Sequence, residues 1–448
     1  MERQSSEEVL TKLRRIAELA EKAPNMSFTS LSHHIDLEWL TEAFRRTRKD
    51  GAPGIDGATA AGYAENLNDN LQDLLNRAKS GRYRAPAVRR VHIPKGKGRG
   101  TRPIGVPTFE DKVLQRAVVM VLEPVYETIF LDCSYGFRPK RSAHQALNEL
   151  WVEMMKMGGG WVVEVDIKGY FDAIPHDMLR EILRQRVRDG VILRLIGKWL
   201  NAGVLEKGQI SYPEAGSPQG GVVSPLLANV YLHEVMDTWF ENTVRPRLRG
   251  RSVLFRFADD LLVGFSLESD ARRFLNVIPK RLARYGLEIH PDKTRLVNFR
   301  RPSGKGRGNA VKGSERPGTF SFLGFTHHWG LSRKGNWVIR RKTAKDRFSK
   351  AINAIRLWCR RARHLPIKDQ RDMLARKLLG HYAYYGITWN NDGVARFYRE
   401  CTRVWFKWLR RRSNRSNLIW DDFNRLLERL KLPLPRIVHS FVPHAAKP

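Results

Sequence analysis

Cysteine is scarce in this sequence, with three residues in a chain of 448. Cys133, Cys359 and Cys401 lie far apart and form no Cys-x-x-Cys pair. Thiolate zinc sites need such closely spaced pairs, and disulfide frameworks need more cysteines than this. The sequence therefore argues against a zinc knuckle and against a small secreted domain held together by disulfides.

Long apolar runs are also missing. No stretch approaches the roughly 18 apolar residues that a membrane span requires, so no membrane partner is expected. Residues 1–8 contain no apolar signal core, which favours a cytoplasmic protein. Hydrophobic residues still make up 42% of the chain, with 12 Trp, which is typical of a globular protein. The length predicts roughly two to four domains.

Acidic residues are in deficit, because 46 Asp and Glu face 80 Lys and Arg and leave a formal net charge of +34. Such an excess favours a polyanionic partner, most often nucleic acid. Beyond residue 330, clustered cations alternate with aromatic residues, which predicts a basic helical domain with an aromatic core that binds phosphate backbones. The alternative, ordinary surface charge on a helical bundle, leaves the size of the excess unexplained.

Two adjacent aspartates, Asp259 and Asp260, separate two short apolar runs within residues 254–265. The runs predict two buried strands joined by a tight turn, with both carboxylates at its tip. Neighbouring like charges are costly to bury unless cations neutralise them, so the pair indicates a divalent metal site and phosphoryl-transfer chemistry. The alternative is a solvated surface turn, because Asp is common in turns.

Two further features precede this hairpin in the chain. Asp166 ends a predicted buried strand at residues 161–167. Residues 82–106 predict another hairpin, whose tip at residues 95–100 alternates Lys or Arg with Gly. Accessible backbone N–H groups beside cations suit phosphate binding, although a flexible solvated loop has the same composition.

In this order the motifs resemble the palm of a reverse transcriptase, and the longer matches resemble the bacterial, endonuclease-lacking class of group II intron-encoded reverse transcriptases and maturases. The resemblance covers nearly the whole chain. The stretches that carry it are 93–95 with 102–108, 135–139 with 142–144, 217–221 with 224–229, 254–265, 286–294, 322–325 and 380–386. One departure is Phe257, which stands where the family usually has Tyr before Ala-Asp-Asp.

The resemblance implies an α+β right-hand polymerase fold with fingers, a palm built on an antiparallel sheet, a helical thumb and an N-terminal helical extension. The implied domains are an extension with a template-clamping segment at 1–76, fingers and palm at 77–328, a maturase or thumb domain at 329–411, and a short C-terminal, DNA-binding segment at 412–448. For the extension, a helical cap that only completes the fold is the alternative.

The resemblance also implies the site residues. The catalytic residues would be Asp166, Asp259 and Asp260, which with the backbone carbonyl of Ile167 would hold two Mg²⁺ ions, for which Mn²⁺ can substitute. The implied dNTP contacts are Lys95, Arg102, Phe171, Gln219 and Lys293. The implied template and primer contacts are Arg138, Pro218, Gly220, Phe257, Arg410, Arg411 and Arg412.

Several of these roles have alternatives. Phe171 matches a bulky position that excludes a ribose 2′-hydroxyl, but core packing would use the same residue, and Tyr170 competes for the role. Lys293 matches a general acid for pyrophosphate, although a cation near a phosphate channel needs no catalytic role. Gln219 and Gly220 could belong to a turn that only starts a helix.

The implied function is an RNA-directed DNA polymerase that adds dNTPs to a primer 3′-hydroxyl by two-metal phosphoryl transfer. Intron RNA binding, splicing assistance and retrohoming would accompany it. The partners would be an RNA template, a DNA primer or target DNA, and dNTPs. One alternative is a protein that is mainly an RNA-binding splicing cofactor, and another is a domesticated reverse transcriptase in DNA repair or phage defence. The intact aspartates favour the polymerase.

Overall fold

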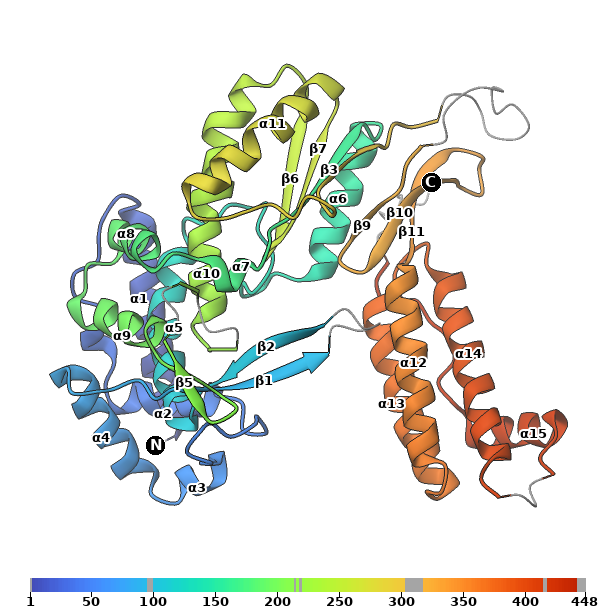
Figure 1. Cartoon of the computed structure of the whole chain (residues 1–448), viewed down its shortest axis with the longest axis horizontal. Coiled ribbons are helices and arrows are strands. Elements are labelled where there is room, and N and C mark those ends of the chain that lie inside the picture. Colours follow the sequence, from blue (N-terminus) through green and yellow to red (C-terminus); the bar gives the residue numbers. More distant parts are fainter. Residues whose placement is uncertain are drawn as a thin grey trace. The chain divides into compact units, whose positions relative to one another are not determined.

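The computed structural model describes residues 2–94, 100–212, 215–216, 220–302, 317–413 and 417–440. The chain divides into two compact units, one of residues 1–143 and 163–296 and the other of residues 144–162 and 297–448 (Figure 1). These units differ from the expected domain boundaries, because residues 144–162 and 297–328 belong to the same unit as the C-terminal helices. The functional boundaries therefore stay a prediction.

The first unit begins with helices that pack on one long buried helix. Both α1 (Glu2–Lys22) and α2 (Leu37–Arg46) contact α5 (Phe109–Glu127). The carboxylate of Asp36 caps α2 by accepting a hydrogen bond from the backbone N–H of Trp39. The Trp39 indole then donates to the Ala117 carbonyl of α5 at 2.9 Å, which fixes α2 against it. Two further helices follow α2, α3 (Ala60–Ala64) and α4 (Leu67–Ser80).

The expected hairpin in residues 82–106 is confirmed. Strand β1 (Val88–Pro94) pairs antiparallel with β2 (Thr101–Val106). On its other side, β1 pairs parallel with β4 (Val204–Glu206), which pairs antiparallel with β5 (Gln209–Ser211). A segment far along the chain thus completes this sheet.

A second sheet carries the acidic motifs, with the strand order β6-β7-β3-β8. Its strands are β3 (Trp161–Asp166), β6 (Ser252–Phe257), β7 (Asp260–Phe265) and β8 (Arg295–Asn298). The antiparallel pairing of β6 and β7 confirms the expected Asp-Asp hairpin. Beside β3, an isolated bridge joins Ile289 to Ile167, and the chain then turns through residues 290–293.

The first unit contains further helices between the strands of this sheet in chain order. Helix α11 (Glu268–Arg284) packs on β7. The other helices are α7 (Tyr170–Ala173), α8 (His176–Arg186), α9 (Gly190–Leu200) and α10 (Ser224–Leu232). The turn at Gly220 is followed by α10, from which the chain continues through π-helical turns at His233–Thr238 and Phe240–Val244.

The second unit contains a three-stranded antiparallel sheet of β9 (Phe320–Phe322), β10 (Phe325–Leu331) and β11 (Trp337–Thr343). The expectation of a purely helical domain from residue 329 is therefore wrong at its start. In β11 the buried positions alternate at Ile339, Arg341 and Thr343, which is the period of a strand with one face covered. Arg341 is consequently buried and not a surface cation.

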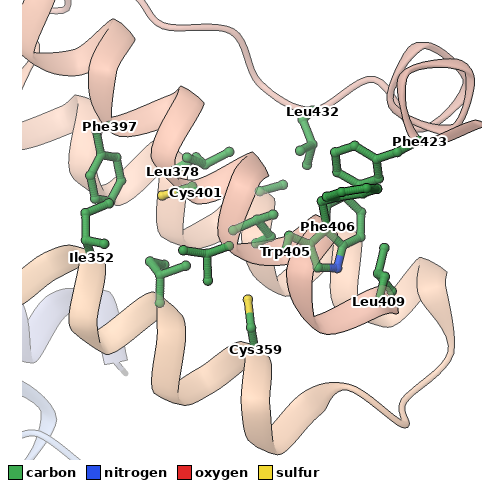
Figure 2. Close-up of a cluster of buried hydrophobic side chains, with 14 of the residues drawn as sticks. Ile352, Cys359, Leu378, Phe397, Cys401, Trp405, Phe406, Leu409, Phe423 and Leu432 are labelled. Atoms are coloured by element: carbon green, nitrogen blue, oxygen red, sulfur yellow. The ribbon is translucent and has the colours of Figure 1, made fainter. Parts of the chain in front are cut away.

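In the described residues, the second unit also has the helices α6 (Ala143–Lys156), α12 (Lys345–Ala362), α13 (Ile367–Tyr385), α14 (Asn391–Arg410) and α15 (Trp420–Leu430). Figure 2 shows the core that the last four share, with Phe397, Trp405 and Phe423 among its side chains. The expected aromatic core is thus confirmed. Cys359 and Cys401 are buried in this cluster as free thiols. The α+β class with antiparallel strand pairing is confirmed as well.

Candidate active site

The acidic hairpin turns through a backbone conformation that its surroundings hold in place. Ala258 has a φ of 56°, in the left-handed region that non-glycine residues rarely adopt. The backbone of Gly136 lies so close that a Cβ atom there would come within 2.4 Å of the Ala258 nitrogen. The Asn229 amide donates to the Gly136 carbonyl at 2.7 Å, so α10 anchors the segment that supports the turn.

A buried ion pair fixes the strand that leads into this turn. The guanidinium of Arg256 lies 2.6 Å from a carboxylate oxygen of Asp237, and both side chains are fully buried. Another Arg256 nitrogen donates to the Asn229 side-chain oxygen at 2.7 Å. Burial alone would raise the pKa of Asp237, but the charge of Arg256 outweighs it and the net pKa is lowered. The pair was not expected from the sequence, although an arginine inside an apolar strand was a usable signal.

Asp166 and Lys293 meet beside the hairpin. The Lys293 ammonium lies 2.8 Å from the Asp166 carboxylate. The segment that carries Lys293 is tied to the end of β3, since the His290 N–H donates to the Asp166 carbonyl at 2.7 Å and the Asp166 N–H to the Thr294 hydroxyl at 3.4 Å. The structure thus brings together two predicted residues from separate motifs.

Asp259 belongs to the same electrostatic neighbourhood. Burial raises the pKa of its carboxyl above the usual value, and the charge of Asp166 raises it further, while Arg102 and Lys293 act in the opposite direction. Asp260 follows on the exposed side of the turn. A buried carboxyl crowded by a second one favours a bound cation, so the donor chemistry fits Mg²⁺.

The three carboxylates do not form a complete ligand cluster. Within the described ranges, no group of three or more His, Cys, Asp and Glu side chains is close enough to hold a metal ion. Asp166 is paired with an ammonium instead. Ile167, whose carbonyl was expected to be a ligand, is buried and bridged to Ile289. The metal site stays a prediction.

The two aromatic residues after Asp166 have different environments. Tyr170 is buried, and its hydroxyl donates to the Ala228 carbonyl at 2.6 Å. Phe171 is half-buried, with its ring centroid 5.4 Å from that of Tyr170. Tyr170 is therefore committed to the core, and Phe171 is the one with surface left for a ligand.

The glycine-rich turn before α10 packs on the first hairpin. Gly220 has a φ of 122°, and a Cβ atom there would come within 2.4 Å of the Gly105 carbonyl oxygen of β2. The Gln115 side-chain oxygen accepts hydrogen bonds from the N–H groups of Val222 and Val223. These contacts hold Gly220 beside β2, which also carries the exposed Arg102. Lys95, Pro218 and Gln219 lie outside the described residues.

Two of the expected template and primer contacts, Arg138 and Phe257, are buried or half-buried. The Arg138 side chain is 4% exposed, and its guanidinium donates to Glu127 and to the carbonyls of Leu131 and Ser134. This geometry favours a structural role for Arg138. Phe257 is half-buried.

The basic cluster Arg410, Arg411 and Arg412 is exposed in the second unit. Two of its guanidinium groups lie over rings of α14. Arg410 is 5.8 Å from the Phe406 ring centroid, and Arg411 is 5.8 Å from the Trp408 ring centroid. The aromatic rings thus support an exposed positive surface that could face a phosphate backbone.

Known proteins are similar to this chain in sequence. Residues 93–327 match the family described as reverse transcriptase (RNA-dependent DNA polymerase). Protein YkfC of Escherichia coli (strain K12) is 37% identical over 282 residues, which cover 56% of this chain and 74% of that protein. Group II intron-encoded protein LtrA of Lactococcus lactis subsp. cremoris is 44% identical over 182 residues, 41% of this chain and 30% of LtrA.

A more distant relative is the mitochondrial protein Nuclear intron maturase 2 of Arabidopsis thaliana, which is 27% identical over 236 residues. The alignment covers 44% of this chain and 30% of that protein, so this chain matches less than a third of the length of the intron-related proteins LtrA and Nuclear intron maturase 2. In the part of the chain that the structure describes, no helix has the length and apolar character to cross a bilayer.

Proposed function

The chain belongs to the reverse transcriptase (RNA-dependent DNA polymerase) family, and from this premise we propose that it extends a primer 3′-hydroxyl with dNTPs while copying an RNA template. The observation that carries the proposal is the gathering of Asp166, Asp259, Lys293 and Arg102 around one hairpin tip. Carboxylates beside cations are the groups that transfer of a nucleotidyl unit to a hydroxyl requires.

Asp166, Asp259 and Asp260, with the Ile167 carbonyl, would hold two Mg²⁺ ions, for which Mn²⁺ can substitute. When bound, the ions supply activation of the 3′-hydroxyl and neutralisation of the pyrophosphate leaving group. Arg102 presents a positive charge near the Asp259 carboxylate. It would bind the triphosphate of the incoming nucleotide together with Lys95.

Lys293 has two roles in this proposal. Its ammonium neutralises the Asp166 carboxylate, from which it lies 2.8 Å away. With a nucleotide bound, the same ammonium would donate its proton to an oxygen of the departing pyrophosphate, which lowers the negative charge that develops there.

Nucleotide and template selection would come from the elements around the hairpin. Phe171 would close the space that a ribose 2′-hydroxyl needs, because Tyr170 is held in the core. Gly220 and Gln219 would approach the nascent base pair, since the backbone of Gly220 packs on β2 beside Arg102. Phe257 would contact the primer through its ring, without the hydroxyl of the usual tyrosine.

Primer extension tests the polymerase. The Asp259→Ala protein should lose extension on an RNA template by several orders of magnitude, while Asp177→Ala, which removes an exposed carboxylate of α8 in the same unit, should retain it. The assay should use RNA and DNA templates with dNTPs or rNTPs, because Phe171→Ala should admit rNTPs. Extension retained by Asp259→Ala contradicts the assignment of the aspartates.

A second role, assistance in splicing a group II intron and in its mobility, is supported by the exposed cluster Arg410, Arg411 and Arg412. The relative named group II intron-encoded protein LtrA, which is 44% identical over 182 residues, also supports it. Splicing of a linked intron should fail when the three arginines are changed to glutamate and should survive Asp259→Ala. If the charge reversal leaves splicing intact, this cluster is not the RNA-binding surface.

Cytoplasmic location also stays a proposal.

A further inference from the structure

A basic cavity of about 590 Å³ lies in the first unit, lined by parts of α8, α9 and the segments that enter β1 and leave β5. Figure 1 shows α8, α9 and β5 close to one another, and α8 contacts α9. Five cations line the cavity: Arg84, Arg180, Arg184, Arg194 and Lys198. No Asp or Glu is among the described lining residues, and none of the predicted polymerase-site residues is among them either.

The helices place these cations in rows. Arg180 and Arg184 are four residues apart on α8, and Arg194 and Lys198 are four residues apart on α9, so each pair shares one helix face. Like charges at this spacing disfavour the helix by a few tenths of a kcal/mol per pair. Both pairs lie on the faces that line the cavity, so positive charge from the two helices is concentrated there.

Several of these cations have no internal partner. Lys198 is engaged, because its ammonium donates to the carbonyls of Gly81 and Tyr83. Arg180 lies 3.5 Å from the carboxylate of Asp177, which is itself 94% exposed. For Arg84, Arg184 and Arg194, the described part of the chain offers the guanidinium groups no ion-pair or hydrogen-bond partner.

A second cavity of the same unit, of about 330 Å³, also has basic walls but differs in this respect. There the Arg281 guanidinium donates to the carbonyls of Glu234 and Val235 and lies 4.4 Å from the Tyr285 ring centroid. Arg281 is therefore held by the protein itself, in contrast to Arg84, Arg184 and Arg194 of the larger cavity.

An aromatic residue stands among the lining residues of the larger cavity. Tyr212 is 72% exposed, and its ring rests against Gly203, where a Cβ atom would come within 3.1 Å of the ring. Ile210 beside it is 52% exposed. A flat exposed ring next to unpaired guanidinium groups is the combination that single-stranded nucleic acid uses, with bases stacked and phosphates neutralised.

We propose that this cavity is a second nucleic-acid site, which holds the phosphates of a single-stranded RNA loop on Arg84, Arg184 and Arg194 with one base stacked on Tyr212. The proposal rests on the proposed function only in taking RNA as the partner. One guanidinium group can bind two oxygens of a phosphate at once. Here three guanidinium groups come from three separate segments, which suits successive phosphates of one strand.

Binding of a fluorescent RNA hairpin with a single-stranded loop tests the proposal on the full chain. The Arg184→Glu/Arg194→Glu protein should bind at least about tenfold more weakly than the wild type. The slope of log affinity against log salt should fall by roughly 0.7 for each phosphate that the variant no longer neutralises. Tyr212→Ala should weaken binding without changing that slope, because it removes no charge.

The matched control is Arg249→Glu/Arg284→Glu, which makes the same charge change at exposed residues of the same unit outside this cavity. It should retain most of the affinity. Equal decreases in affinity for the two double variants overturn the proposal, since only net charge would then matter. Unchanged hairpin binding by the cavity variant also overturns it.

Two further measurements distinguish RNA binding at this cavity from misfolding of the variant and from a small-nucleotide site. At saturating primer–template, primer extension by Arg184→Glu/Arg194→Glu should stay near the wild-type rate. This result would show that the variant is folded, and it tests the polymerase function independently of the cavity. Arg184→Lys/Arg194→Lys should restore most of the affinity for the hairpin. If free AMP displaces the hairpin from the wild type at micromolar concentration, the cavity is a small-nucleotide site and the assignment to RNA is wrong.

Discussion

The Lys293 ammonium lies 2.8 Å from the Asp166 carboxylate, and the two residues come from separate motifs of the same unit. A carboxylate that is proposed to bind metal thus also has a cationic partner within the chain. The ammonium satisfies the charge of Asp166 and also holds Lys293 near the position where the leaving group is expected. Metal and lysine should therefore compete for the same carboxylate.

This competition predicts opposite effects on metal affinity and turnover. In Lys293→Gln, the Mg²⁺ concentration needed for half-maximal extension should fall, because no ammonium competes for Asp166. The kcat should fall by roughly 10² to 10⁴, which is the usual contribution of a general acid. Magnesium titrations of single-nucleotide incorporation measure both quantities. In Lys293→Arg, the guanidinium should still compete with Mg²⁺ for Asp166. If the kcat of Lys293→Gln equals that of the wild type, Lys293 is not the general acid.

The buried Arg256–Asp237 pair should dominate the stability of the strand that enters the catalytic turn. Asp237→Ala leaves Arg256 charged and fully buried, so the free energy of unfolding should fall by about 3–5 kcal/mol. The control is Glu241→Ala, which breaks a pair with the half-exposed Arg245 and should cost less than about 1 kcal/mol. Urea unfolding measures both changes, and similar decreases in the two variants would show that the buried pair has no special weight.

Sequence reasoning predicted those parts of the site that depend on local pattern. The hairpin with Asp259 and Asp260 follows from two apolar runs around a turn, and the structure has it. The Arg256–Asp237 pair was not predicted, because it joins a strand to a π-helical turn that no sequence period marks. The burial of Arg341 was not predicted either, since the basic run beyond residue 330 hides the alternation of β11.

Gly220 should be intolerant of any side chain. An alanine Cβ would lie 2.4 Å from the Gly105 carbonyl and would also strain the φ of 122°, so Gly220→Ala should move the turn away from β2. Primer extension should fall at least about tenfold, the range that small misplacements of a site produce. Gly208→Ala is the control, because its φ is also positive at 85° but no atom lies within 4 Å of the added Cβ. Equal activity in the two variants contradicts this packing argument.

His381 should make the second unit sensitive to acid. Burial lowers the pKa of its imidazole from 6.5 to about 4, and the ring stacks on Phe397 with centroids 3.5 Å apart. Because the folded pKa is lower, the unfolded chain binds more protons below pH 6.5, so stability falls as the pH drops from 6.5 toward 4. The titration of this histidine alone should make the free energy of unfolding about 2 kcal/mol lower at pH 5 than at pH 7.

Replacing the ring tests this pH dependence without removing the stack. The phenylalanine in His381→Phe cannot be protonated. Between pH 7 and pH 5 the free energy of unfolding should therefore fall by about 2 kcal/mol less in this variant than in the wild type. His327, whose pKa burial also lowers, remains in both proteins and leaves a shared acid sensitivity. His364→Phe changes an exposed ring of the same unit and should leave the wild-type pH profile unchanged. If His381→Phe and the wild type lose equal stability on acidification, protonation of His381 is not what destabilises the helices around Phe397.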